Sequence, residues 1–247
     1  MEYRVLILGD RAITFEFGAV ISKRISHHVL GVHAQLKESI AQGHVNGIIE
    51  SVPTFRSLTV HYNPLVLLPD EVEALVAPYI KEGDEVSGPC TEWSFPVCYS
   101  GEFAPDIKDV AHRTGLKTED VINIHQAAVY DVFMLGFLPG FAFLGLVDER
   151  LQLPRRGEPR TAVPRGSVAI ADQLTAIYPT VSPGGWNLIG TTPIELFDLG
   201  QKNAALLKAG DRVGFRAVSE SEFRKIQTSI AAGDYSYQNE CQVKEVA

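Results

Sequence analysis

Four apolar residues follow Arg4 in the segment 4–8, and apolar and polar residues then alternate over positions 12–17. Both patterns predict short strands, and Gly9 with Asp10 supplies the turn between them. From Val20 to about Ala41, apolar residues recur every three or four positions, which puts them on one face of a helix. The chain therefore opens with two strands and a long amphipathic helix.

Two further strands are predicted at residues 47–52 and 57–62, and Pro69 opens a second helix. The resulting order, β-β-α-β-β-α, is typical of a compact α+β domain with helices on one face of an antiparallel sheet. Residues 81–89 are polar and rich in glycine, as a linker is. We therefore expect an α+β N-terminal domain over residues 1–85.

The second half begins with a strand at 93–99 and helices at 106–114 and 118–127, after which short apolar segments dominate. Strands are predicted at 129–135, 167–171, 175–178, 193–199 and 212–216. Segments of this kind, separated by Gly and Pro, indicate a mainly-β barrel or sandwich over residues 86–235. Ser219 and Glu222 form a capping box for a last helix that ends at Gly233, and 236–247 is expected to be a loosely held polar tail.

One segment, 129–147, is apolar enough to test as a membrane span, and Gly136 and Gly140 stand at GxxxG spacing. Asp131 and Pro139 interrupt it, and freed backbone groups are costly in lipid. Buried strands joined by a tight loop are the better prediction, so no membrane partner is expected.

Composition narrows the function classes. The 247 residues carry a net charge of -8, which argues against a nucleic-acid partner because phosphate binding needs an excess of clustered Lys and Arg. The three cysteines have no CxxC spacing and indicate neither a disulfide framework nor a metal site. A reducing, cytoplasmic location is expected. The sequence has no GxxxxGK[ST] phosphate loop, so a nucleotide would have to be held by another chain or an unfamiliar fold.

The strongest chemical signal is a cluster of arginines with Glu158 as the one acid among them. Its members are Arg150, Arg155, Arg156, Arg160 and Arg165. Planar guanidinium groups match carboxylate and phosphate oxygens, and the neighbouring prolines would hold the loop in place. The cluster is either an anion site or a set of ion pairs with acids such as Asp148 and Glu149, or stacks on aromatic rings.

A second segment offers backbone polar groups beside an aromatic side chain. Gly184, Gly185 and Trp186 are candidates for a backbone anion nest beside an aromatic wall, or for ordinary turn chemistry over a core tryptophan.

His125 ends a predicted helix and is a candidate general base, with a core histidine as the alternative. Gln173 and Tyr178 flank a predicted strand and are candidates to reach the same cleft, although Tyr is also a common sheet residue.

Four segments together resemble one protein family. They read YDVFMLGFLPGFAFL at 130–144, LPRRGEPR at 153–160, GSVAIA at 166–171 and YPTVSPGGWNLIG at 178–190. The chain is similar to the B subunit of bacterial 5-oxoprolinase, in a family with the sporulation-kinase inhibitor KipI, proteins labelled allophanate hydrolase subunit 1, and part of the carboxyltransferase region of urea carboxylase.

This resemblance implies a cyclophilin-like barrel in the second domain. It also implies that the partners are the KipA-like C subunit of the same complex, together with its A subunit, in the ATP-dependent opening of 5-oxoproline to glutamate. ATP would be shared with or held by a partner. Two alternatives stay open: an inhibitor that binds a histidine kinase, and a subunit for allophanate or urea-derived chemistry.

The resemblance further implies that Arg155, Arg156 and Arg160 bind substrate carboxylate or phosphoryl oxygens. Gly184, Gly185 and Trp186 would form a cleft wall, and His125 and Tyr178 polar supports. The sequence departs from the family pattern at three positions, with Asp172 for a glycine, Arg165 for an alanine and Thr191 for an arginine. The loss of an arginine at position 191 together with the gain of Arg165 would relocate a positive charge or alter the ligand.

Overall fold

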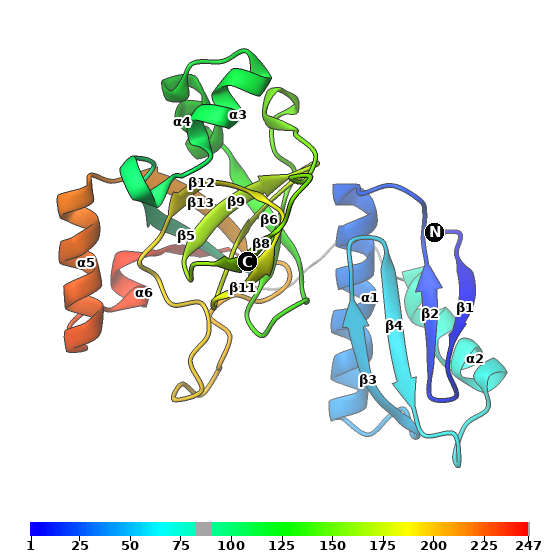
Figure 1. Cartoon of the computed structure of the whole chain (residues 1–247). Coiled ribbons are helices and arrows are strands. Elements are labelled where there is room, and N and C mark those ends of the chain that lie inside the picture. Colours follow the sequence, from blue (N-terminus) through cyan, green and yellow to red (C-terminus); the bar gives the residue numbers. More distant parts are fainter. Residues whose placement is uncertain (83–89, 247) are drawn as a thin grey trace. The chain divides into compact units, whose positions relative to one another are not determined.

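The computed structural model describes residues 1–82 and 90–246, and Figure 1 shows their elements. The chain divides into two compact units, Met1–Pro89 (unit 1) and Cys90–Val246 (unit 2). The predicted boundary between residues 85 and 86, like most of the predicted linker, lies outside the described residues.

Unit 1 is a four-stranded antiparallel sheet, in the order β1-β2-β4-β3, with two helices. The elements are β1 (Arg4–Leu8), β2 (Ala12–Glu16), α1 (Lys23–Ala41), β3 (Ile48–Pro53), β4 (Ser57–Tyr62) and α2 (Pro69–Glu82). Their order matches the predicted β-β-α-β-β-α. Alternate strand residues such as Phe15 and Val60 share one core with Val32 of α1 and Val76 of α2, so both helices cover the same face of the sheet.

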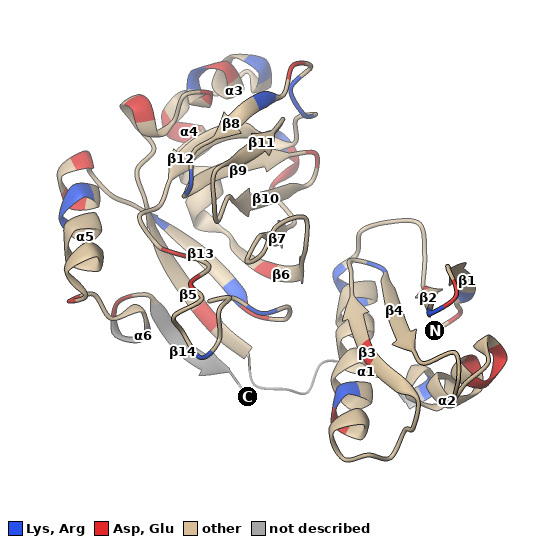
Figure 2. Cartoon of the chain, turned by 60° about the horizontal axis from the view of Figure 1, so that its bottom comes forward, with Lys and Arg blue, Asp and Glu red and all other residues tan. Residues whose placement is uncertain are grey.

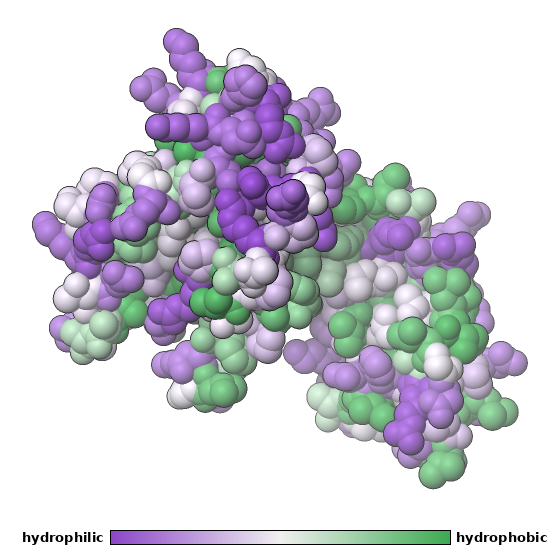
Figure 3. All heavy atoms as spheres, in the orientation of Figure 1, coloured by the Kyte–Doolittle hydropathy of each residue, from purple (hydrophilic) through white to green (hydrophobic). Residues whose placement is uncertain are grey.

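Strand β1 lies at an edge of this sheet and carries exposed apolar side chains. Leu6, Ile7 and Leu8 are 39%, 64% and 55% exposed. Figure 3 shows hydrophobic atoms at the surface of unit 1. An open edge with apolar side chains is the kind of surface on which another chain can pair.

Unit 2 is built on an eight-stranded sheet in the order β12-β9-β10-β7-β6-β13-β5-β14. Its strands are β5 (Cys90–Val97), β6 (Val129–Leu135), β7 (Ala142–Gly145), β9 (Ser167–Ala171), β10 (Leu174–Ile177), β12 (Asn187–Thr191), β13 (Arg212–Ala217) and β14 (Gln242–Val246). A separate two-stranded sheet pairs β8 (Arg160–Val163) with β11 (Ser182–Gly184). The apolar run 129–147 thus forms β6, β7 and the tight loop between them, as predicted.

The large sheet curls until its two sides meet. Cys98, directly after β5, exchanges two backbone hydrogen bonds with Thr191 at the end of β12, with N–O distances of 2.9 and 3.0 Å. Seven strands therefore surround a core that includes Phe95, Val132 and Ile170, all fully buried. Strand β14 lies outside this ring, paired with β5.

Helices and short 3-10 turns flank the curled sheet. They are η1 (Gly101–Phe103), α3 (Ile107–Thr114), α4 (Thr118–Ala127), η2 (Glu149–Leu151), α5 (Glu220–Ala232) and α6 (Tyr237–Glu240). The N-cap bond of the predicted capping box is present, because Ser219 Oγ accepts from Glu222 N, whereas the Glu222 carboxylate accepts from Arg216 instead. Gly233 ends the helix with a φ of 78°. Figure 2 shows acidic and basic residues interspersed on α3 and α5.

Two predictions for unit 2 are wrong. Residues 193–199 form no strand: Pro193 offers no N–H, and Asp198 turns the chain by accepting from Gly200 N at 2.8 Å, which leaves a single bridge between Phe197 and Ala205. Residues 236–247 were expected to be a polar tail, but they include α6 and strand β14. Among the described residues, no helix combines the length and apolar character needed to cross a membrane.

Candidate functional site

A buried carboxylate, Asp106, organises the arginine-rich loop. Asp106 Oδ1 accepts from Arg156 Nη1 at 3.0 Å and from Arg160 Nη2 at 2.7 Å, and Oδ2 accepts from Arg160 Nη1 at 3.0 Å. The Arg160 contact is bidentate, which is the strong geometry for this pair. Asp106 itself is 4% exposed, whereas the two arginine side chains are about a third exposed.

Backbone bonds fix the Asp106 carboxylate in place. Oδ2 also accepts from Leu188 N at 2.7 Å, and Asp106 N donates to Leu188 O at 3.0 Å. Asp106 lies directly before α3, and Leu188 lies in β12 of the curled sheet. The carboxylate thus ties the arginine loop to two rigid elements.

Arg155 stands apart from this ion-pair cluster. Its guanidinium carbon lies 5.8 Å from the centroid of the Trp186 ring, a cation–π arrangement. No ion pair joins Arg155 to an acid among the described residues. Trp186 is 5% exposed and meets Phe141 and Phe143 edge to face, so the ring under Arg155 is held by packing.

Tyr178 and the glycine pair complete this wall. The Tyr178 hydroxyl accepts from the backbone N–H of Trp186, and a Cβ at Gly184 would lie 2.3 Å from that hydroxyl oxygen. Burial raises the pKa of Tyr178, while the nearby Arg155 and Arg160 guanidiniums and the Trp186 N–H act in the opposite direction. Gly185 O accepts from Arg156 N at 2.7 Å, so the glycine segment lies against the arginine loop.

The remaining two arginines of the cluster pair elsewhere. Arg150 binds Asp148 through Nε and Nη2, both at 2.8 Å, which is one of the pairings considered from the sequence. Arg165 binds Glu195 at 2.7 Å. The five arginines therefore do not form one anion site: Arg156 and Arg160 share Asp106, and Arg155 lies over Trp186.

His125 is fully buried and lies away from this wall. Its ring bonds to the Tyr99 hydroxyl at 2.8 Å and to Thr175 Oγ1 at 3.0 Å, and it stacks on Phe215 with ring centroids 4.6 Å apart. Burial lowers the pKa of His125 to about 3. This placement favours the core histidine over the general base.

Gln173 also lies apart from the cluster. It is exposed in the turn between β9 and β10, and strand β10 separates it from Tyr178. Its backbone holds the turn, because Val147 N donates to Gln173 O at 2.9 Å. Residues that flank a strand in sequence lie at its opposite ends, so Gln173 and Tyr178 do not share a cleft.

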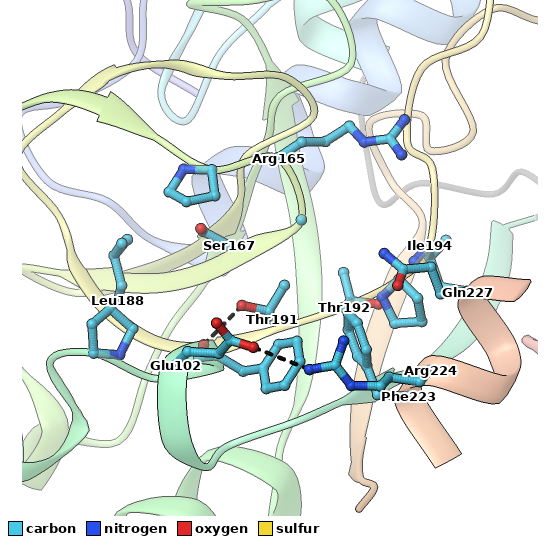
Figure 4. A pocket seen from close by; sticks show the side chains of 15 residues that line it. Glu102, Arg165, Ser167, Leu188, Thr191, Thr192, Ile194, Phe223, Arg224 and Gln227 are labelled. Atoms are coloured by element: carbon cyan, nitrogen blue, oxygen red, sulfur yellow. Dashed lines mark hydrogen bonds and ion pairs between the residues drawn. The ribbon is translucent and has the colours of Figure 1, made fainter. Parts of the chain in front are cut away.

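A cavity of about 340 Å³ opens beside the Asp106 cluster. Figure 4 shows the residues that line it, which come from η1, the β8–β9 loop, β12 with the segment after it, and α5. Two of the three departures from the family pattern, Arg165 and Thr191, line this one cavity. The third, Asp172, has a φ of 51°, which explains why a glycine suits that turn.

Sequence reasoning missed Asp106, the residue on which the cluster depends. Its partners are 50 and 54 positions away, and no local pattern encodes such a pairing. The one available signal was an acid at the first position of a predicted helix. Among the described residues, no group of three His, Cys, Asp or Glu side chains could hold a metal ion.

Residues 3–207 match the family described as carboxyltransferase domain, subdomain C and D. The B subunit of 5-oxoprolinase from Bacillus subtilis (strain 168) is 38% identical over 236 residues, which cover 90% of this chain and 96% of that protein. The chain belongs to the family of 5-oxoprolinase B subunits. The membership predicted from the four sequence segments is therefore confirmed.

Solved structures share the fold of this chain. The crystal structure of TTHA0988 has a TM-score of 0.72 and is 35% identical over 85% of this chain, which spans 40% of that longer chain. The Kluyveromyces lactis urea carboxylase has a TM-score of 0.79 over 99% of this chain and 24% of its own. At 19% identity the second likeness shows the fold alone, a mixed α/β fold with a curled sheet.

Proposed function

We propose that this chain is the B subunit of an ATP-dependent 5-oxoprolinase, which opens 5-oxoproline to glutamate together with the A and C subunits of the complex. The observation that carries the proposal is the 38% identity to the Bacillus subtilis protein over 96% of its length. The arginine–tryptophan wall adds a surface suited to a carboxylate, which 5-oxoproline bears.

The chemistry requires energy from ATP because a lactam is a stable amide. Transfer of the γ-phosphoryl group to the amide oxygen releases ADP and makes the carbonyl carbon electrophilic. Water then adds to that carbon, the C–N bond breaks, and hydrolysis of the phosphoryl group leaves glutamate and phosphate. The sequence has no phosphate loop, so the proposal assigns ATP to a partner chain and expects this chain to be inactive alone.

Within this chain, we assign the substrate carboxylate to Arg155. Asp106 engages Arg156 and Arg160, so these two hold the loop while Arg155 keeps its donors for a ligand above Trp186. Arg155 and Arg160 both lie close enough to Tyr178 to act on its pKa, so the wall carries positive charge for an anion. Gly184 and Gly185 form the wall, and Tyr178 supports it through the hydrogen bond from the Trp186 backbone N–H.

Two features support an assembly in a reducing compartment. The apolar edge strand β1 offers a surface for a partner chain. Cys90, Cys98 and Cys241 are free thiols, as expected for the cytoplasm. The proposal therefore places the complex there, with the cyclophilin-like character of unit 2 carried over from the family.

The test is ADP and glutamate release from ATP and 5-oxoproline by the three purified subunits, with each omitted in turn. Product must require this chain. Arg155→Ala should lower the rate at least about tenfold, because a charged hydrogen bond to substrate contributes about 1.5–3 kcal/mol. Arg150→Ala, which removes an exposed arginine paired with Asp148, is the matched control and should act like wild type.

Co-elution of the Arg155→Ala chain with its partner subunits would show that the complex still assembles, so a lower rate then reflects loss of substrate binding. If omission of this chain leaves product release unchanged, the oxoprolinase proposal fails. The match to a carboxyltransferase domain then favours urea-derived carboxylation as the second candidate.

A further inference from the structure

The cavity lined by Arg165 and Arg224 forms a second site, separate from the Arg155–Trp186 wall. Figure 4 shows Arg165 on one side and Arg224 with Glu102 on the other, with Ser167 and Thr191 between them. At about 340 Å³ the cavity is at the lower end of the range for small-molecule pockets. It therefore suits a metabolite rather than a chain segment or a dinucleotide.

Both arginines keep hydrogen-bond donors for a ligand. Arg165 uses Nη1 for Glu195 at 2.7 Å, and Arg224 uses Nε and Nη2 for Glu220 and Glu102. Within the described residues, Arg165 Nε and Nη2 and Arg224 Nη1 have no partner. Each side chain is 54% exposed, and ion pairs this open to water exchange readily with a ligand.

The acidic residues beside Arg165 and Arg224 indicate which class of ligand the cavity suits. Glu102 lies in the lining itself, and Glu195 and Glu220 bind the same two guanidiniums. Two positive groups are thus matched by three negative ones, so a polyanion such as ATP would meet repulsion inside the cavity. A ligand that carries a carboxylate and an ammonium group satisfies both signs.

Ser167 points to a bound polar group. The residue is 3% exposed and lines the cavity, and its hydroxyl makes no hydrogen bond within the described part of the chain. The hydroxyl is therefore free to bond to a ligand that enters the cavity. Phe103 and Phe223, whose ring centroids are 4.5 Å apart, form an apolar wall opposite for the carbon chain of a ligand.

We propose that this cavity binds a zwitterionic small molecule of the α-amino acid class. Arg165, Arg224 and the Ser167 hydroxyl donate hydrogen bonds to carboxylate oxygens of the ligand. The Glu102 carboxylate accepts from its ammonium group. The choice of L-glutamate as the probe rests on the proposed function, since glutamate is the product of that reaction. The charge pattern that defines the class is independent of it.

The experiment titrates L-glutamate into the isolated full chain, without ATP or partner subunits, and follows binding by calorimetry. Glutarate, which keeps both carboxylates but lacks the ammonium group, is the comparison ligand. Glutamate should bind at least about tenfold more tightly than glutarate, and Arg224→Gln should weaken glutamate by a similar factor. Glu102→Gln should bring the two affinities together, because it removes the partner of the ammonium group.

Arg150→Gln, outside the cavity lining, is the control and should bind as wild type does. Equal affinities for glutamate and glutarate in the wild type would reduce the site to a simple anion site and overturn the proposal. Absence of saturable binding up to about 10 mM, or an unchanged affinity in Arg224→Gln, would also overturn it. None of these results bears on product release by the complex, so the two proposals fail separately.

Discussion

Replacement of Asp106 by Asn should destabilise unit 2 more than any nearby charge substitution. Each carboxylate oxygen accepts from two donors: Oδ1 from Arg156 and Arg160, and Oδ2 from Arg160 and Leu188 N. In Asn, one of the two oxygens is replaced by an NH₂ group, which donates and cannot accept. The two N–H groups that bonded to that oxygen then lose their acceptor and face another donor. The substitution also leaves two guanidiniums without their counter-charge.

The magnitude follows from burial. Removal of one partner from a fully buried ion pair costs about 3–5 kcal/mol. Here Asp106 is buried but both arginines are about a third exposed, so water can take up part of the lost interaction. We expect a loss of about 2–3 kcal/mol, which corresponds to about 4–12 °C in the melting temperature of a domain of this size.

Tryptophan fluorescence during urea unfolding measures this loss in unit 2, because both tryptophans, Trp93 and Trp186, lie there. Asp148→Asn is the matched control: it removes one carboxylate bound to an arginine, but in an exposed pair, and should change little. A midpoint for Asp106→Asn that coincides with that of Asp148→Asn would refute the reasoning that burial makes Asp106 a structural anchor.

Two further outcomes concern the wall and the core. Gly184→Ala should destabilise unit 2 by about 1–3 kcal/mol, because the new Cβ would lie 2.3 Å from the Tyr178 hydroxyl. Gly157→Ala is the control and should be tolerated, because its Cβ would have no atom within 4 Å. Equal urea midpoints for the two variants would contradict this prediction. Because burial lowers the folded-state pKa of His125 to about 3, the unfolded chain takes up its proton first as the pH falls below about 6.5, so stability should fall by up to about 1.4 kcal/mol per pH unit. Urea midpoints between pH 7 and 5 measure this slope, which should be smaller in His125→Gln.

The fold could be predicted where local signals were strong. The helix of α1 followed from its apolar period, and the cap of α5 from Ser219 and Gly233. Strand β14 could not be found this way, because an edge strand is selected by pairing with β5 and its own sequence is polar. The short strands β8 and β11 pair with each other across loops, so their existence depends on tertiary contacts.

The candidate site was predicted in part. The contact between the arginine loop and the glycine–tryptophan segment is present, through Arg156 N and Gly185 O and through Arg155 over Trp186, and Pro154 and Pro159 restrict the backbone of that loop. The charge balance of the cluster was not predictable, since Asp106 reaches it only through the folded sheet. The sequence suggested His125 as a candidate for the site, but both of its ring nitrogens form hydrogen bonds inside the core, to the Tyr99 hydroxyl and to Thr175 Oγ1.

One residue connects the arginine cluster to the cavity. Leu188 N donates to Asp106 Oδ2 and Leu188 O accepts from Asp106 N, and Leu188 also lines the cavity that holds Arg165 and Arg224. The sheet holds Leu188, because β12 is bonded to β9, so the segment around Asp106 is the part that loosens when these bonds are weakened. Pro105, directly before Asp106, also lines the cavity. Asp106→Asn should therefore weaken glutamate binding in the cavity as well as destabilise unit 2, even though Asp106 is not among the cavity-lining residues.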